Sequence, residues 1–246
     1  MKPRTIGRLS VSVIGLGCNN FGRSLDARKT AAVVDAALDA GIVFFDTSDN
    51  YGDGRSEDFL ARALGDRRDE VVIATKFGMP VAGFPGSGGA APGYVERAVD
   101  RSLRRLRTDR IDLYQLHTPD PGTPIEDTLG ALDGLVRAGK VLEIGCSNLT
   151  ADQVTAAAAA ARRRGTAPFV THQVEYSLLH RDPEHDGVLD ACPREGMTLI
   201  PYFPLAAGLR GSTPPPASPL ASWPVHLVLG RLAQQHLAHL GGRFAL

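Results

Sequence analysis

The sequence predicts an α/β fold, a (β/α)8 barrel of the TIM type with parallel strands. Two observations favour it: apolar, β-prone runs alternate with helix-patterned segments, and polar residues stand at the ends of successive strands. Strands that are apolar throughout are typical of parallel sheets covered on both faces. Seven strands and six intervening helices are recognisable, so we expect an incomplete barrel in which an eighth strand is not seen.

The strands are expected where β-prone runs occur, at residues 11–17, 42–47, 70–76, 111–117, 140–147, 168–174 and 197–203. Helices are expected near residues 27–40, 55–64, 93–106, 125–138, 150–164 and 184–195. The first of these helices carries an alanine and valine stripe and ends at Gly41. Thr150 and Asp152 are candidate caps for the alanine-rich helix that follows them.

The main alternative to a barrel is a doubly wound open sheet. A dinucleotide-binding sheet would carry G-x-G-x-x-G after its first strand, and "GLGCNNFG" has its glycines at a different spacing. The polar residues favour the barrel, because strand ends converge on its C-terminal rim but would spread along a line in an open sheet. The residues at or just past the strand ends are Asp46, Lys76, His117, Ser147, Asn148, Gln173 and Tyr202.

Composition favours a small molecule as the partner. The chain has 246 residues, of which 43% are hydrophobic, which is enough for a real core. Lys plus Arg equals Asp plus Glu, 27 each, so the net charge is zero. We therefore expect no binding to nucleic acid or to anionic membranes. No segment approaches the roughly 20 apolar residues of a membrane span.

The cysteines indicate a reducing compartment. Cys18, Cys146 and Cys192 are an odd number without the spacing of a metal site, so neither a disulfide framework nor a metal is expected. We expect all three to pack as small apolar residues in a cytoplasmic protein.

Each rim residue has an ordinary structural explanation when it is taken alone. Asp46 suits a turn or a helix N-cap, Tyr51 a half-buried ring, and Lys76 a side chain that extends to water. His117 precedes the turn sequence "TPDPGTP". Gln173 is less ordinary, because a glutamine inside an apolar strand needs a hydrogen-bond partner.

Taken together, four of these residues form a proton-donating group. A tyrosine has an ordinary pKa of about 10, and an adjacent ammonium is expected to lower the pKa of Tyr51. A buried Lys76 would need the Asp46 carboxylate to remain charged. His117 could donate a hydrogen bond to the same substrate oxygen. Such a group can protonate the oxygen of a carbonyl that accepts hydride.

The hydride must come from a cofactor, because no side chain supplies one. Ser147, Asn148 and Gln173 carry the donors and acceptors needed to hold a carboxamide. Tyr202 has a flat face on which a nicotinamide ring could stack. The predicted site therefore combines a proton donor with a nicotinamide-binding region.

The chain resembles the aldo-keto reductase family in six sequence motifs. The motifs that carry the resemblance lie between about Arg4 and Leu209, in the family's order: "FFDTSDNYG", "IATKFG", "DLYQLH", "IGCSN", "HQVEYSLL" and "PYFPLAAGL". The resemblance implies a (β/α)8 barrel whose bottom is closed by a hairpin near residues 4–12. It also implies reduction of a carbonyl compound with NADPH, or with NADH as the other possibility.

The resemblance assigns roles to the rim residues. It implies a catalytic tetrad of Asp46, Tyr51, Lys76 and His117. The nicotinamide amide would be held by Ser147, Asn148 and Gln173, and its ring would stack on Tyr202. Leu205, in the last motif, is also a cofactor-binding candidate.

The sequence changes character after residue 209. Residues 196–246 contain no Asp or Glu, and prolines crowd the segment 210–224. We expect that segment to be irregular and 225–246 to contain a helix and a tail. The barrel would then occupy residues 1–209. We interpret the chain as a truncated or frame-shifted reductase, with a divergent C-terminus as the alternative. An open barrel edge could promote association, although the oligomeric state is undetermined.

Three functions are compatible with the sequence. The first is an NAD(P)H-dependent reductase of aldehydes or ketones, acting on a small carbonyl substrate in a poorly covered pocket. The second is a non-catalytic or defective barrel that serves at most as a binding or regulatory module. The third is a Schiff-base aldolase in which Lys76 is the nucleophile.

Overall fold

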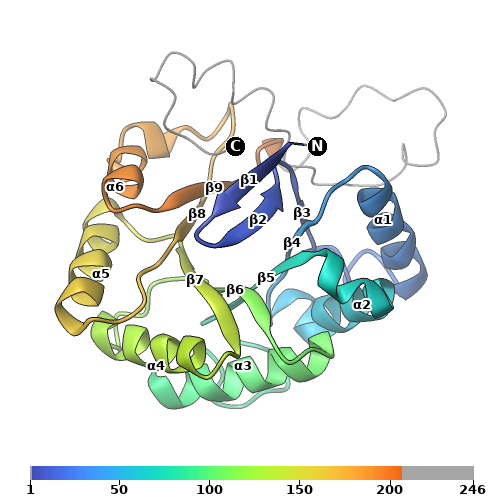
Figure 1. Ribbon diagram of the computed structural model, residues 1–246, viewed down its shortest axis with the longest axis horizontal. Coiled ribbons are helices and arrows are strands. Elements are labelled where there is room, and N and C mark those ends of the chain that lie inside the picture. The colour runs from blue at the N-terminus through green and yellow to red at the C-terminus, as the bar shows by residue number, and fades with distance from the viewer. Residues whose placement is uncertain (1, 207–246) are drawn as a thin grey trace.

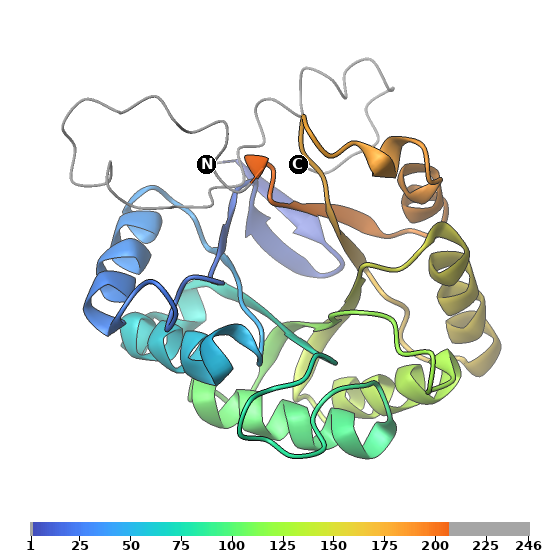
Figure 2. The ribbon, with the colours of Figure 1, turned by 180° about the vertical axis from the view of Figure 1, so that it is seen from behind.

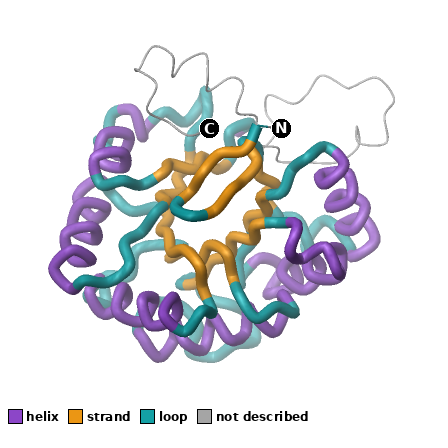
Figure 3. The backbone as a smooth tube through the Cα atoms, in the orientation of Figure 1, coloured by secondary structure: helices purple, strands orange, loops and turns teal. Residues whose placement is uncertain are grey.

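In the part of the chain that the structure describes, the barrel sheet contains seven parallel strands that neighbour one another in chain order. A computed structural model describes residues 2–206 of the protein. The strands are β3 (Gly15–Gly17), β4 (Phe44–Asp46), β5 (Val72–Phe77), β6 (Ile111–Leu116), β7 (Val141–Ser147), β8 (Thr171–Glu175) and β9 (Thr198–Tyr202). The sheet curls into a nearly closed ring (Figure 3), which confirms the predicted incomplete barrel. Within the described residues, β3 and β9 end the sheet and do not pair with each other.

The six α-helices of the described residues form a layer outside the strands (Figure 1, and from behind in Figure 2). They are α1 (Ala27–Asp39), α2 (Arg55–Leu64), α3 (Pro92–Leu106), α4 (Ile125–Arg137), α5 (Ala151–Arg164) and α6 (Val188–Arg194). Thr150 caps α5 in a reciprocal capping box with Gln153, as its side chain predicts, whereas Asp152 lies inside the first turn. The helix expected at 184–195 begins only at Val188, because Gly187 has a φ of +83° and separates it from a 3₁₀ turn.

The prediction of one strand over residues 11–17 was wrong. This run contains the end of β2 (Leu9–Ser12), which pairs antiparallel with β1 (Pro3–Ile6), and the barrel strand β3. Ser12 redirects the chain between them: its hydroxyl donates to the carbonyl oxygen of Ile14 at 2.6 Å and accepts from the backbone N–H of Val43 at 3.0 Å. The β1–β2 hairpin lies across one end of the ring (Figure 1), as expected for residues 4–12.

Adjacent residues of β4 belong to two separate cores. In β4, Phe45 faces the helices and joins the large core between sheet and helix layer. Its neighbour Phe44 faces the barrel interior and packs in a second cluster with the hairpin, which contains Ile6, Leu9, Val11, Ala74 and Leu113. The hairpin thus closes the bottom of the barrel by burying apolar side chains, and the opposite rim is left for the site.

The predictions for the cysteines, for membrane spans and for the C-terminal segment have different outcomes. Cys18, Cys146 and Cys192 are buried and free of disulfides, as expected. No helix within residues 2–206 is both long and apolar enough to cross a membrane. The irregular segment predicted at 210–224 and the helix predicted within 225–246 lie outside the described residues.

Candidate active site

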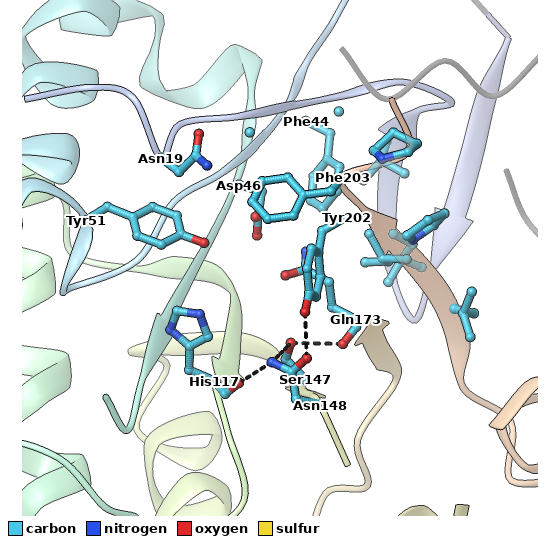
Figure 4. Close-up of a pocket in the computed structure, with 18 of the residues that line it drawn as sticks. Asn19, Phe44, Asp46, Tyr51, His117, Ser147, Asn148, Gln173, Tyr202 and Phe203 are labelled. Atoms are coloured by element: carbon cyan, nitrogen blue, oxygen red, sulfur yellow. Dashed lines mark hydrogen bonds between the residues drawn. The ribbon is translucent and has the colours of Figure 1, made fainter. Parts of the chain in front are cut away.

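A cavity of about 820 Å³ opens at the C-terminal rim and extends along the gap between β3 and β9. Its volume lies in the range of small-molecule sites. Residues of both edge strands and of the hairpin line it, among them Gly17, Ile200 and Val11. Figure 4 shows most of the predicted site residues around this cavity, with the Tyr51 ring directed toward its middle.

Asp46 and Lys76 form the buried ion pair that the sequence suggested. The Lys76 ammonium lies 2.8 and 2.7 Å from the two carboxylate oxygens of Asp46 and donates a third bond to the Thr47 carbonyl at 3.0 Å. Gln115, from the next strand, donates to Asp46 Oδ1 at 3.3 Å. Lys76 is 0% exposed. Its side chain therefore does not extend to water, which was the structural alternative to a role in the site.

Tyr51 reaches the ion pair because the segment after β4 turns sharply. The 3₁₀ turn Tyr51–Gly54 contains Gly52 at φ +57°, and a Cβ at Gly52 would lie 2.9 Å from the carbonyl oxygen of Phe21. Only glycine fits this left-handed, tightly packed position. The Lys76 ammonium lies 5.2 Å from the centroid of the Tyr51 ring. The His117 ring stands edge-on to Tyr51, with 5.8 Å between ring centroids.

The prediction of a lowered Tyr51 pKa was wrong. Burial of the phenol raises its pKa above the ordinary 10, and the Lys76 ammonium opposes that effect only in part. Burial acts to lower the pKa of Lys76, but the attraction of Asp46 and Tyr51 outweighs it and the pKa is raised. At neutral pH, Tyr51 is therefore protonated and Lys76 is a cation.

His117 is a neutral imidazole. Burial, assisted by the Lys76 charge, lowers its pKa from 6.5 to about 3. Its Nδ1 lies 3.1 Å from the hydroxyl of Ser48, a residue that the sequence did not single out. At neutral pH the ring can exchange hydrogen bonds with a ligand without adding charge to the cavity.

The predicted amide-binding residues lie together on the opposite side of the cavity (Figure 4). Tyr202 Oη donates to Asn148 Oδ1 at 3.0 Å, and Asn148 Nδ2 donates to the His117 carbonyl oxygen at 3.0 Å. The Ser147 hydroxyl donates to the carbonyl oxygen of Gln173 at 2.8 Å. Hydroxyl, amide and aromatic groups thus lie on one wall of the cavity. The hydroxyl and amide groups suit a carboxamide, and the aromatic ring suits a flat ring that carries it.

Some site residues differ from the sequence-based expectation. Leu205 is not among the residues that line the cavity. Asn19 and Phe203 do line it, and the buried Oδ1 of Asn19 has no hydrogen-bond partner within the described part of the chain. Asn19 follows the end of β3 by two residues, so the rule that found Asp46 could have found it.

His172 supports the amide-binding wall from behind. It is 0% exposed, and its Nε2 accepts from the backbone N–H of Leu149 at 3.0 Å. Burial lowers its pKa to about 4, so the ring is neutral and can accept this bond. The contact fixes the chain just after Asn148, whose φ of +61° is unusual for a non-glycine residue.

The strand order and the helix layer define a protein of the α/β-barrel class. Residues 13–217 match the Aldo/keto reductase family, past the boundary at residue 209 expected from the sequence. The match covers most of the chain, so the chain belongs to the aldo/keto reductase family.

Three relatives agree with this assignment. The chain is 38% identical over 225 residues to the uncharacterized oxidoreductase YrpG of Bacillus subtilis (strain 168), covering 86% of this chain and 68% of the relative. It is 36% identical over 207 residues to probable aldo-keto reductase 1 of Glycine max (82% and 58%). It is 39% identical over 215 residues to the NADP(+) aldo-keto reductase yakc of Schizosaccharomyces pombe (83% and 61%). The matched region thus spans 58 to 68% of these relatives.

Proposed function

We propose that this protein reduces an aldehyde or a ketone to an alcohol at the expense of NAD(P)H. The observation that carries the proposal is the Lys76 ammonium, held 2.8 and 2.7 Å from the Asp46 carboxylate and 5.2 Å from the Tyr51 ring centroid. A buried cation beside a protonated phenol is an arrangement that favours proton donation, because it stabilises the phenolate left behind.

In the proposed reaction Tyr51 is the acid. A nicotinamide cofactor, when bound, would supply hydride to the carbonyl carbon. The developing oxyanion would take the Tyr51 proton, and the Lys76 ammonium would stabilise the resulting phenolate. Asp46 keeps Lys76 charged and in place. His117 lines the same cavity and would contact the same substrate oxygen.

The cofactor would be held by the wall opposite Tyr51. Ser147, Asn148 and Gln173 offer the hydroxyl and amide groups that a carboxamide needs, and Tyr202 offers a ring face. Asn19 lines the cavity, and its Oδ1 has no hydrogen-bond partner among residues 2–206, which is compatible with a further polar ligand group. One relative's name specifies NADP(+), which supports NADPH as the first cofactor to test.

Titration of the full chain with NADPH, and with NADH alongside, tests the proposal. Cofactor fluorescence should report saturable binding, and a panel of small aldehydes and ketones should then oxidise the bound NADPH. A folded chain that binds neither cofactor would contradict the proposal. Asn148→Leu, which removes amide donors from the wall, should weaken binding, while Asn20→Leu, outside the cavity lining, is the matched control.

A non-catalytic barrel is the second candidate, and one observation favours it. Within residues 2–206, the edges of β3 and β9 are not paired, and both line the cavity. Such a barrel would bind a ligand without turnover. NADPH binding without oxidation by any carbonyl in the panel would select this alternative.

The geometry disfavours the aldolase alternative. An amine nucleophile must be uncharged, but three hydrogen bonds hold the Lys76 ammonium and its pKa is raised. Borohydride trapping with a carbonyl compound should therefore give no adduct on Lys76.

A further inference from the structure

Ser56, in the first turn of α2, joins this helix to the ends of two strands. The residue is 0% exposed. Its hydroxyl donates to the carbonyl oxygen of Cys18 at 2.8 Å, and its oxygen lies 2.8 Å from Thr47 Oγ1. Because its single proton goes to that carbonyl, Ser56 accepts from Thr47. Cys18 directly follows β3, and Thr47 directly follows Asp46 at the end of β4.

Glu57, the next residue, joins the same helix turn to β5 and to α3. It is also 0% exposed, and its Oε1 accepts from the Thr75 hydroxyl at 2.6 Å. Its Oε2 accepts from Arg105 Nε at 2.6 Å. A buried carboxylate is tolerated where it is paired and hydrogen-bonded, and Glu57 meets both conditions.

The contact with Thr75 acts on the strand that carries Lys76. Thr75 and Lys76 are adjacent in β5, and successive side chains of a strand lie on opposite faces of the sheet. Thr75 is bonded to α2 on one face, while Lys76 is bonded to Asp46 on the other. The first turn of α2 therefore holds the outer side of the strands whose inner side holds the ion pair.

The turn between β4 and α2 has a left-handed backbone. Gly52, Asp53 and Gly54 have φ values of +57°, +59° and +89°. For Asp53, which is not a glycine, this conformation is costly and persists only where the surrounding structure fixes it. Tyr51 stands at the start of this turn, and the two anchored residues of α2 follow its end.

We propose that Ser56 and Glu57 are positioning residues that set the distance between the Tyr51 phenol and the Lys76 ammonium. They fix the far end of the left-handed turn to the strands on which the ion pair is built, so the phenol keeps its place beside the ammonium. The catalytic consequence of this inference rests on the proposed function. The position of the phenol does not depend on that function.

Carbon NMR of the full chain labelled with ¹³Cζ-tyrosine tests the position of Tyr51 without any turnover. The chain has five tyrosines, and the Tyr51 signal is assigned by its loss in Tyr51→Phe. The Lys76 charge lies 5.2 Å from the centroid of the ring, so a displaced ring should have a different chemical shift. Ser56→Ala should therefore move the Tyr51 signal.

Ser102→Ala is the matched control for Ser56→Ala. Ser102 lies in α3 and is also 0% exposed, but its hydroxyl has no hydrogen-bond partner among residues 2–206. The control should leave the Tyr51 signal in place. A signal that is unchanged in Ser56→Ala, or that moves equally in both variants, would overturn the proposal.

Thr75→Val tests the role of Glu57. It removes the hydrogen bond to Oε1 and keeps the ion pair with Arg105, so the variant should fold and the Tyr51 signal should move. Thr30→Val is its control, because Thr30 is 0% exposed and its hydroxyl is unpartnered in the described part of the chain. An unchanged Tyr51 signal in Thr75→Val would overturn the role of Glu57.

Kinetics test the catalytic consequence. Ser56→Ala should lower kcat for carbonyl reduction at least about tenfold, because misplacing a reacting group by about 1 Å can cost about 100-fold. The Kd of NADPH should not change, since Ser56 does not line the cavity. Ser102→Ala should leave both quantities unchanged.

Two outcomes of these kinetics decide between a positioning role and a merely structural one. A wild-type kcat in Ser56→Ala, or an equal loss of kcat and of NADPH-binding capacity, would overturn the catalytic consequence. If Ser56→Ala moves the Tyr51 signal but the wild-type chain reduces no carbonyl, the proposed function fails and the positioning role stands.

Discussion

The Lys76 ammonium lies 2.8 and 2.7 Å from the two carboxylate oxygens of Asp46, on neighbouring parallel strands. Asp46 is opposite Ala74 in the strand register, so Lys76 extends from two residues further toward the rim. The side chain of Lys76 is 1% exposed and that of Asp46 is 15% exposed, so the solvation of both charges is restricted. Removing either charge therefore leaves the other without its counter-ion, at a cost in stability. Variants that remove one or both charges can separate this structural role from the proposed catalytic role.

The pairing of the two charges predicts the behaviour of single and double variants. Lys76→Met leaves the Asp46 carboxylate, which is 15% exposed, without its cation, and should lower the free energy of unfolding by about 3–5 kcal/mol. Adding Asp46→Asn removes the unpaired charge and should recover most of this loss. Urea denaturation measures both effects. Carbonyl reduction should be absent in both variants, and a double variant no more stable than Lys76→Met would contradict this account.

The buried carboxyl group of Asp49 should make the free energy of unfolding depend on pH. It is 2% exposed, and burial, followed by the nearby Glu57 carboxylate, raises its pKa from 3.8 to about 7. Between these values the folded chain keeps a proton that the unfolded chain has released. The contribution of Asp49 to stability therefore falls as pH rises from about 4 to about 7, and is constant above.

Asp49→Asn removes this titration and keeps an acceptor for the Tyr94 hydroxyl, which lies 3.3 Å from Asp49 Oδ2. The stability of the variant relative to wild type should increase by roughly 2–4 kcal/mol between pH 4 and pH 8. Denaturation at both pH values measures this difference. Asp53→Asn, at an exposed carboxylate in the same turn, is the control. Equal differences at both pH values for Asp49→Asn would refute the assignment.

Two glycines with similar backbone angles predict different costs of substitution. Gly52 has φ +57° and ψ +29°, and Gly165 has φ +65° and ψ +30°, so alanine is strained in the same way at both. A Cβ at Gly52 would lie 2.9 Å from the Phe21 carbonyl oxygen, whereas nothing lies within 4 Å at Gly165. Gly165→Ala should cost about 1 kcal/mol, and Gly52→Ala about 1–3 kcal/mol more.

Gly52→Ala should also reduce carbonyl turnover, because Gly52 follows Tyr51 directly and its displacement moves the phenol. Gly165→Ala, at the end of α5, should leave turnover unchanged. Thermal unfolding and initial rates measure the two effects. Equal losses of stability in the two variants would show that the Phe21 contact does not constrain the turn.

The barrel and most of the rim site could be predicted from sequence because both follow from parallel strands. Continuously apolar runs indicated strands covered on both faces, and polar residues at their ends had to converge on one rim. Asp46 and Lys76 meet for this reason, although 30 residues separate them in the chain. Asn19 obeys the same rule and could have been included.

Other features depend on tertiary contacts that a local pattern does not reveal. The β-prone run 11–17 is divided because the Ser12 hydroxyl bonds to the backbone of Val43, far along the chain. The direction of the Tyr51 pKa shift depends on how deeply the ring is buried, and a nearby cation alone suggested the wrong sign. The contact of Ser48 with His117 joins residues 69 positions apart.

The most direct test of the central claim is deuterium transfer from NADPH labelled on the transferring face of its nicotinamide C4. The full chain is incubated with the labelled cofactor and an aldehyde, and the alcohol is analysed by mass spectrometry. We expect one deuterium on the carbinol carbon, with a rate at least about 100-fold lower for Tyr51→Phe and cofactor binding retained. A wild-type chain that binds NADPH without forming the labelled alcohol, or a Tyr51→Phe variant of near-full activity, would contradict the proposed role of Tyr51.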